Sequence, residues 1–159
     1  MRFRSYLFIP FLVVSVFSSC PSSNTWKTKC YVFQTEKMEF SKAETVCIKK
    51  GGHLASIPDF FVNNVIGQAG KFAFQSVTDF WIGASKKTSW EWTDGSNFPN
   101  FTDWARGEPS RNGTEQNCAF MSYFNWDWKT ENCSNLKPFV CGIPIQSFKT
   151  SRIRSARNR

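Results

Sequence analysis

Residues 102–118, with the sequence TDWARGEPSRNGTEQNC, concentrate side chains that could bind a ligand. Glu108 and Glu115 offer carboxylates, and Ser110 and Gln116 offer neutral oxygens. Calcium in proteins takes roughly 6–8 oxygen ligands, and carboxylates supply the charge that sets its affinity. The stretch therefore carries the kind of donor that calcium uses, but alone it supplies too few for a complete site.

The segments before this stretch predict a hairpin and a helix. Residues 20–33 become aromatic and β-branched toward their end, which indicates the second arm of a short hairpin. Ser41 and Glu44 match a capping box, in which a hydroxyl and a carboxylate satisfy free backbone donors at a helix start. The predicted helix ends at Gly51-Gly52, and its apolar face consists of Phe40, Ala43, Val46 and Cys47.

A second helix and several short strands are expected further on. The helix follows Asp59, and its predicted apolar face consists of Phe61, Val62, Val65, Ile66 and Ala69. Strands are predicted at residues 53–57, 80–83, 90–96, 118–123, 126–130 and 138–141.

Between about residues 97 and 117 little is periodic, and a loop of that length inside a compact domain is usually functional or disordered. This order of elements predicts an α+β domain whose function lies on the long loop.

The N-terminus and the cysteines indicate an exported protein. Arg2 and Arg4 precede the apolar residues 6–17, which is typical of a secretory signal peptide over residues 1–18, with cleavage after Ser18. No later segment has the roughly 20 apolar residues that span a membrane. The chain has six cysteines, an even number that predicts three disulfides, although composition alone leaves their pairing open.

Three tripeptides match the acceptor sequence for N-linked glycans, and they begin at Asn100, Asn112 and Asn132. A glycan on Asn112 would lie on the same loop as Glu108 and crowd the surface that faces a ligand. The alternative is a sequon that carries no glycan. The third sequon includes Cys133, which makes it the weakest of the three.

The basic charge belongs to the ends of the chain. The formal net charge of +8 falls to +1 when the two arginines of the leader and five cations of the tail are set aside. Those five are Lys149, Arg152, Arg154, Arg157 and Arg159. A nucleic-acid-binding domain usually spreads its basic residues over one folded face, so nucleic acid is not an expected partner. Residues 146–159 also lack the apolar side chains needed for packing and are predicted to be disordered.

Several landmarks in register carry a family resemblance. They are Cys20-Pro21, Cys30-Tyr31, GGHLASI at 51–57, Trp81-Ile82-Gly83, Trp92-Thr93-Asp94-Gly95-Ser96, Trp104, Gly107-Glu108-Pro109, Cys118 and Phe139-Val140-Cys141. With these residues the chain resembles a C-type lectin-like domain over residues 20–142. It looks most like the long form found among the small secreted single-domain proteins that are numerous in nematodes.

The resemblance implies a fold, a disulfide pairing and a role for the tryptophans. The fold would be α+β, with two helices packed on short antiparallel sheets, a long loop region and three disulfides. The implied pairs are Cys20–Cys30, Cys47–Cys141 and Cys118–Cys133. The tryptophans at positions 81, 92, 104, 126 and 128 would then be mostly core residues, with exposed stacking on sugars as the alternative.

The resemblance also implies which residues would hold calcium. In sugar-binding members the ligands are a Glu-Pro-Asn motif, a Glu before the next Cys, and Asn-Asp after a Trp, and the ion takes sugar hydroxyls as further ligands. Here Glu108 matches and Ser110 replaces Asn. Gln116 stands in place of the second Glu, with Glu115 one residue away.

Counting back from Cys133 places Lys129 and Thr130 over Asn-Asp, and an ammonium has no lone pair to offer. We therefore expect that the loop has lost its metal. The weaker alternative shifts the alignment by two residues and uses Glu108, Glu115 and Asp127 as ligands.

These observations predict a secreted recognition module that binds an extracellular glycan or protein, without a required cofactor. One alternative is a cationic innate-defence effector that uses the tail arginines on anionic microbial surfaces. The other is a calcium-dependent lectin with a degenerate site.

Catalysis is not expected, because no nucleophile stands at a suggestive spacing from a base. We interpret the single histidine, His53, as structural. Asp94, Asp103 and Glu108 could be imagined as paired carboxylates, but the resemblance gives them turn and loop roles. The ligand and the oligomeric state remain open.

Overall fold

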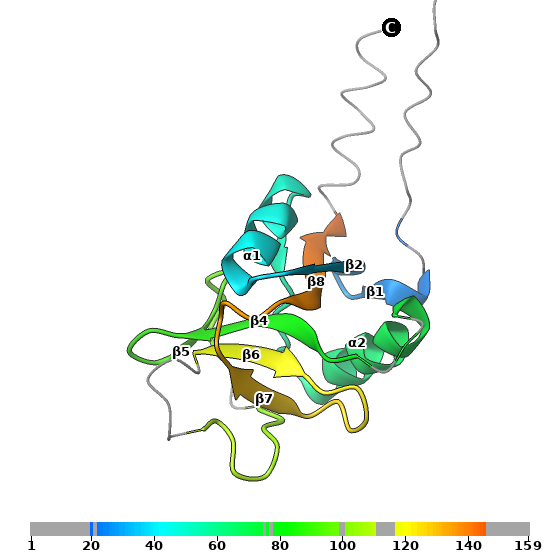
Figure 1. Cartoon of the computed structure of the whole chain (residues 1–159). Helices are drawn as coiled ribbons and strands as arrows, with labels where there is room; N and C mark the ends of the chain where they lie inside the picture. The colour runs from blue at the N-terminus through cyan, green and yellow to red at the C-terminus, as the bar shows by residue number, and fades with distance from the viewer. Residues whose placement is uncertain are drawn as a thin grey trace, which may run out of the picture.

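The strands of this protein form one mixed sheet (Figure 1). The computed structural model describes residues 20, 22–74, 76, 78–98, 101–110 and 117–145 of the 159. The elements in chain order are a short 3-10 helix η1 (Ser22–Asn24), β1 (Thr25–Trp26), β2 (Lys29–Met38), α1 (Phe40–Lys49), β3 (His53–Leu54), α2 (Phe60–Ala73), β4 (Phe80–Lys86), β5 (Trp90–Trp92), β6 (Cys118–Met121), β7 (Trp128–Glu131) and β8 (Lys137–Pro144).

The strand order across the sheet is β1-β2-β8-β4-β6-β7, with β3 also paired to β8 and β5 to β4. Neighbouring strands are antiparallel, except that β4 and β8 run parallel. The last strand in sequence therefore lies in the middle of the sheet, beside one of the first. The strands that precede the long loop (β4 and β5) and those that follow it (β6 and β7) all lie on the same side of β8.

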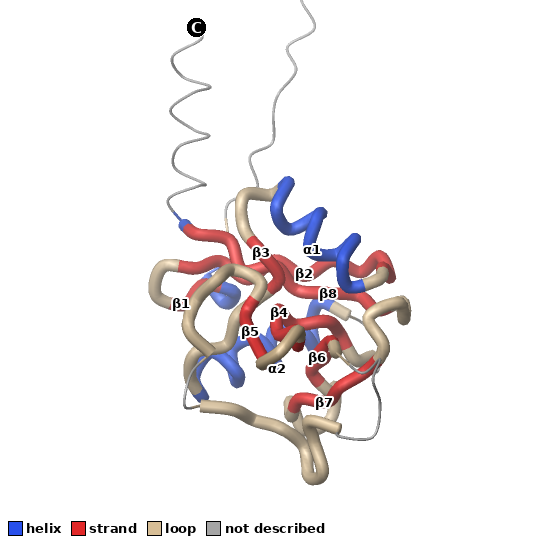
Figure 2. The backbone as a smooth tube through the Cα atoms, turned by 90° about the vertical axis from the view of Figure 1, so that its left-hand side faces the viewer, coloured by secondary structure: helices blue, strands red, loops and turns tan. Residues whose placement is uncertain are grey.

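Each helix covers one face of this sheet. Phe139 and Cys141 of β8 pack with the buried residues of α1, whereas Val140 packs in the separate cluster that contains the buried residues of α2. Figures 1 and 2 show the two helices on opposite sides of the strands. Burial on both faces explains why β8 reads as a continuous apolar run and not as an alternating one. The predicted α+β architecture with two helices is confirmed.

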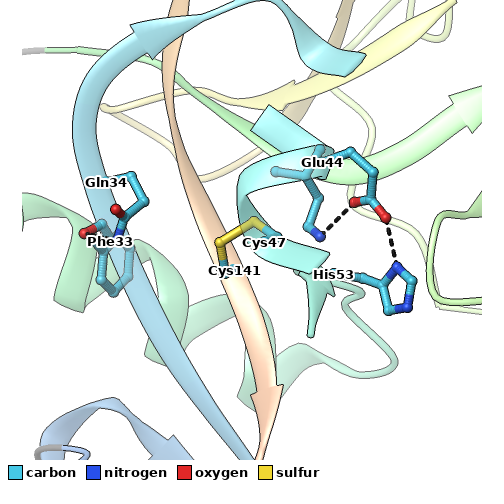
Figure 3. The surroundings of a disulfide bond; sticks show 7 residues. Phe33, Gln34, Glu44, Cys47, His53 and Cys141 are labelled. Carbon is cyan, nitrogen blue, oxygen red and sulfur yellow. Dashed lines mark hydrogen bonds and ion pairs between the residues drawn. A yellow bond between two sulfur atoms is a disulfide. The ribbon is translucent and has the colours of Figure 1, made fainter. Parts of the chain in front are cut away.

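Helix α1 begins at Phe40 and not at a capping box, so that prediction is wrong. Glu39 occupies the N-cap position and makes no side-chain cap hydrogen bond. The Glu44 carboxylate instead accepts a hydrogen bond from the Leu54 backbone N–H at 2.8 Å and contacts His53 Nδ1 at 2.5 Å (Figure 3). Glu44 therefore joins α1 to β3. The predicted buried residues Phe40, Ala43 and Cys47 are confirmed.

Helix α2 starts where Asp59 predicted, because the Asp59 carboxylate accepts a hydrogen bond from the Val62 N–H at 2.9 Å. Its apolar face is only partly as expected. Val62 and Ile66 are buried, but Phe61 is 62% exposed and stacks on Trp26. Polar Asn63 takes the buried position instead, because tertiary hydrogen bonds described below satisfy its amide.

All the predicted strands exist, with shifted ends. The segment predicted at 126–130 begins its strand only at Trp128, because Trp126 has a positive φ of 63° and belongs to the preceding turn. Of the strand predicted at 53–57, only His53–Leu54 forms β3. Ala55 still donates to the Val140 carbonyl of β8 at 2.9 Å and accepts from the Gly83 N–H of β4 at 2.8 Å, and residues 55–57 are buried.

The three disulfides are Cys20–Cys30, Cys47–Cys141 and Cys118–Cys133, as the resemblance implied. Cys47–Cys141 ties α1 to β8 across 94 residues of sequence (Figure 3). Cys118–Cys133 links the start of β6 to the residues just after β7, on the side of the sheet that carries the long loop.

Several expectations lie outside the described residues, among them the signal peptide over 1–18 and the tail over 146–159. Within the described part, no helix is long and apolar enough to cross a membrane.

An ion pair between Lys29 and Asp94 holds the turn after β5 against β2. Lys29 Nζ lies 2.6 Å from Asp94 Oδ2, and the hydroxyl of buried Ser56 donates to the same oxygen at 2.6 Å. The backbone N–H of Ser96 donates to Oδ1 at 3.0 Å. Burial alone would raise the pKa of Asp94, but the hydrogen bonds from Lys29, Ser56 and Ser96 outweigh it and hold the pKa well below its usual range.

Removing the disulfide that joins α1 to β8 is expected to cost the most stability of the three. The variant Cys47→Ala/Cys141→Ala opens a loop of nearly the whole domain, which chain-entropy models value at about 4–5 kcal/mol. Cys20→Ala/Cys30→Ala opens a much shorter loop, and about 3 kcal/mol is expected. Urea denaturation of the secreted protein measures both losses. An equal loss in the two variants would contradict the expectation.

Asp94→Asn is expected to lower stability at pH 7 by about 2–4 kcal/mol, because it leaves Lys29 without its partner. The folded-state pKa of Asp94 lies below the unfolded value of about 3.9. The stabilisation is therefore fully present above that value and is lost as the pH falls toward the folded-state pKa. Urea denaturation at pH 7, 5 and 3 should show the difference from wild type shrinking at the lowest pH. Glu36→Gln, at an exposed position, is the control, and a pH-independent difference for Asp94→Asn would contradict the assignment.

Candidate ligand-binding site

Residues 101–110, the longest described part of the long loop, are fixed beside β7 by backbone hydrogen bonds. The Trp128 N–H donates to the Asp103 carbonyl at 2.7 Å, and the Ala105 N–H donates to the Trp128 carbonyl at 2.9 Å. Trp104 and Trp128 form an isolated parallel bridge. The loop therefore continues the sheet outward past its last strand, with a defined register.

A turn then brings Glu108 back to the same strand. The Glu108 N–H donates to the Ala105 carbonyl at 2.9 Å, and Gly107 has a φ of 86°, which glycine adopts without steric cost. The Glu108–Pro109 peptide bond is cis. This turn places the Glu108 carboxylate against Thr130 of β7.

One oxygen of Glu108 accepts three hydrogen bonds. Oε2 lies 2.6 Å from the Thr130 hydroxyl, 3.1 Å from the Thr130 backbone N and 2.8 Å from the Ser110 backbone N. The Ser110 N–H also lies 3.2 Å from the Thr130 hydroxyl oxygen. Glu108, Ser110 and Thr130 thus form one cluster, which we call the Glu108 latch.

The other predicted site residues are placed differently. Lys129 lies between buried Trp128 and Thr130 on β7 and is half-buried. The carboxylate of Asp127 accepts from the Ser122 hydroxyl at the base of the turn before β7, and among the described residues no hydrogen bond joins it to the latch. Glu115 and Gln116 lie outside the described residues, so the ligand set that includes Glu115 stays a prediction.

The latch does not fit calcium in the geometry that the resemblance implied. Calcium needs oxygens that turn lone pairs toward it, and three donors already converge on Glu108 Oε2. Across the residues the structure describes, no group of three His, Cys, Asp or Glu side chains could hold a metal ion.

The buried side-chain amide of Asn63, on α2, holds the loop in position. Asn63 is 2% exposed, and its Nδ2 donates to Asp103 Oδ2 at 2.7 Å and to the Trp126 carbonyl at 3.2 Å. Its Oδ1 accepts from the indole N–H of Trp128 at 2.8 Å. Sequence reasoning missed Asn63, although a polar residue beside Val62 on the apolar face was a signal that could have been followed.

Asp103 lies in a crowded acidic environment. Burial raises the pKa of its carboxyl, and the neighbouring charge of Asp127 raises the pKa further. The hydrogen bond from Asn63 lowers it, but only in part. Asn63 therefore supplies a donor where an ionised Asp103 most needs one.

Aromatic rings fill the space between the loop and the sheet. Trp81, Trp92 and Trp128 are buried, as expected, whereas Trp104 and Trp126 are only half-buried. Trp90 of β5, which the sequence did not single out, lies 4.8 Å from Trp104 between ring centroids. Both residues of this pair are half-buried, so part of each side chain is accessible on the side of the molecule that carries the loop.

The residues considered for catalysis each have a different partner. Asp94 pairs with Lys29, Asp103 with Asn63, and Glu108 with Thr130. His53 contacts Glu44 beside the Cys47–Cys141 disulfide (Figure 3), on the α1 side of the sheet.

Of the three sequons, only Asn132 lies in the described residues. It is half-buried, and its Oδ1 accepts a hydrogen bond from the Ser134 N–H at 2.9 Å. Asn100 and Asn112 lie outside the described residues, so glycosylation stays a prediction at all three positions.

Asn63→Ala is expected to destabilise the protein by about 2–4 kcal/mol, because it leaves the buried indole N–H of Trp128 and the carboxylate of Asp103 without their partner. Asn64→Ala is the matched control, since the Asn64 amide donates to the Phe60 carbonyl of its own helix and, within the described part of the chain, to no other element. Urea denaturation compares the two variants. Equal losses would show that Asn63 has no special role in holding the loop.

Comparison with known proteins agrees with the fold. The family model described as the Lectin C-type domain matches residues 36–143. The galactose-specific lectin nattectin of Thalassophryne nattereri is 33% identical over 128 residues, which cover 78% of this chain and 80% of that protein.

Two solved structures share the fold. Human lithostathine superposes with a TM-score of 0.72 at 24% identity, covering 79% of this chain and 91% of that one. A calcium-independent type II antifreeze protein superposes with a TM-score of 0.67 at 25% identity, covering 79% of this chain and 95% of that one. Since the family model matches more than half of the sequence, the chain belongs to the C-type lectin domain family.

Proposed function

We propose that this protein is a secreted recognition module that binds an extracellular glycan or protein with the surface formed by residues 101–110, β5 and β7. The observation that carries the proposal is the pairing of a fixed loop with two partly accessible aromatic side chains. Residues 103–110 are held to β7 by hydrogen bonds, and Trp90 and Trp104 lie half-buried beside them. A preorganised surface loses little conformational entropy when a ligand binds.

This surface suits a sugar for a chemical reason. One side of a sugar ring presents C–H groups that pack on an aromatic face, while its hydroxyls need directional polar partners. Trp90 and Trp104 offer aromatic faces for the C–H groups. The half-buried polar side chains around the latch offer hydrogen-bond partners for the hydroxyls. The galactose specificity named for nattectin supports a glycan, and galactose-containing glycans are the first class to test.

Secretion is part of the proposal. The leader-like residues 1–18 support it, and so do three disulfides, which persist in oxidising compartments. The finer resemblance to small nematode lectin-like proteins stays a prediction.

We infer binding and not catalysis. The carboxylates that could have been paired for acid–base chemistry each have a different structural partner. His53 is bound to Glu44 on the opposite side of the sheet from α2 and its contacts with the loop. The family is a lectin domain, which agrees with this inference.

Trp90→Ala is expected to weaken glycan binding about tenfold or more, because a stacked aromatic ring is typical of the few residues that carry binding energy. Phe72→Ala is the matched control, since Phe72 is an aromatic residue of α2 that is 85% exposed. A glycan array with the full secreted chain, read in calcium and again in EDTA, identifies the ligand, and titration calorimetry then measures each affinity. Equal losses in the two variants would place the site elsewhere.

The cationic-effector alternative rests on residues 146–159, outside the described residues. A chain that ends after Ile145 distinguishes it from the recognition module. Unchanged ligand binding by the shortened chain supports the module, and loss of binding to anionic surfaces together with loss of activity supports the effector.

A further inference from the structure

We propose that the Glu108 latch is a metal-independent fastening of the ligand loop, in which Thr130 supplies two of the three hydrogen bonds that hold Glu108. The inference concerns what fixes the loop and does not depend on which ligand the protein binds. Three residues carry it: Glu108 and Ser110 on the loop, and Thr130 on β7.

The latch joins two segments that are distant in sequence. Two of the bonds to Glu108 Oε2 come from Thr130, 22 residues away, at 2.6 Å from its hydroxyl and 3.1 Å from its backbone N. The third comes from Ser110 and closes the loop on itself. A carboxylate that accepts several hydrogen bonds forms charge-assisted bonds, which are shorter and stronger than neutral ones.

A cation would compete with this arrangement. The three donor hydrogens point at Oε2 from the loop and from β7, and their partial positive charges repel an approaching ion. To become a calcium ligand through this oxygen, Glu108 would have to exchange these bonds for the ion.

Thr130 is the residue that makes the fastening possible. It is 7% exposed, so its hydroxyl is shielded from water and depends on protein partners. Its side chain donates to Glu108 while its oxygen lies within hydrogen-bonding distance of the Ser110 N–H, so that one hydroxyl bridges both loop residues. An aspartate at this position would instead put a second negative charge against Glu108.

The test compares thermal unfolding of the full secreted chain in millimolar calcium and in EDTA. The wild type should melt at the same temperature in both, because a ligand that does not bind the folded state cannot stabilise it. Thr130→Val keeps the size and the backbone N–H but removes the hydroxyl, and its melting temperature should fall by roughly 4–10 °C in both buffers. Thr45→Val, at an exposed position of α1, is the control and should change little.

Two further measurements separate the latch from a general loss of stability. The backbone amides of Ser110 and Thr130 should be protected from hydrogen exchange in the wild type, with and without EDTA. The double variant Lys129→Asn/Thr130→Asp should melt lower than the wild type in EDTA and regain part of the difference in calcium, since two facing carboxylates favour a cation. Thr130→Ser, which keeps the hydroxyl, should melt close to the wild type even if Thr130→Val does not fold.

Three results would overturn the proposal. One is a wild-type melting temperature that rises by more than about 2 °C in calcium, which would reveal a bound ion. Another is unprotected Ser110 and Thr130 amides in the wild type. The last is a Thr130→Val variant as stable as the Thr45→Val control.

Discussion

The pairing of β2 with β8 determines where the rest of the chain can lie. The two strands come from opposite ends of the domain, and they pair along most of their length. Because β8 is covered by α1 on one face and by the α2 cluster on the other, a slip of one residue would exchange the two buried sets. With β8 fixed, β4 aligns parallel to it, and β6 and β7 extend the sheet to the side where residues 101–110 attach.

Away from the β2–β8 pair, polar groups fix the position of the loop at residues 101–110. Hydrophobic burial is non-directional, so it holds the loop close to the sheet without fixing its orientation. Asn63 and Glu108 supply the direction, because hydrogen bonds are directional: the buried Asn63 amide and the half-buried Glu108 carboxylate each need partners at defined positions. The loop is therefore held at two points. Asn63 of α2 binds it at Asp103, and Thr130 of β7 binds it at Glu108.

Sequence reasoning succeeded where a local pattern or a family landmark carried the information. The cysteine pairs, the start of α2 at Asp59 and the buried side of α1 all follow from such signals. It failed where a distant residue competes for the same group. Glu44 matched a capping box, yet its carboxylate is used by β3, and Phe61 fitted the helix period while Asn63 took the buried position.

The latch shows the same limit. Thr130 was recognised as a departure from a metal-ligand pattern, but nothing local in the sequence revealed that it bonds to Glu108. A contact between residues so far apart in sequence becomes visible only when the register of loop and strand is known.

The two ends of the described chain meet at one edge of the molecule. The Ile145 N–H donates to the Thr28 carbonyl at 2.8 Å, and in Figures 1 and 2 the end of β8 and the β1–β2 hairpin lie at the opposite end from the loop beside β7. A tether attached next to this edge would leave the loop facing outward. Several such domains held on one support could therefore engage a repetitive surface together, and their combined avidity would exceed that of a single weak site.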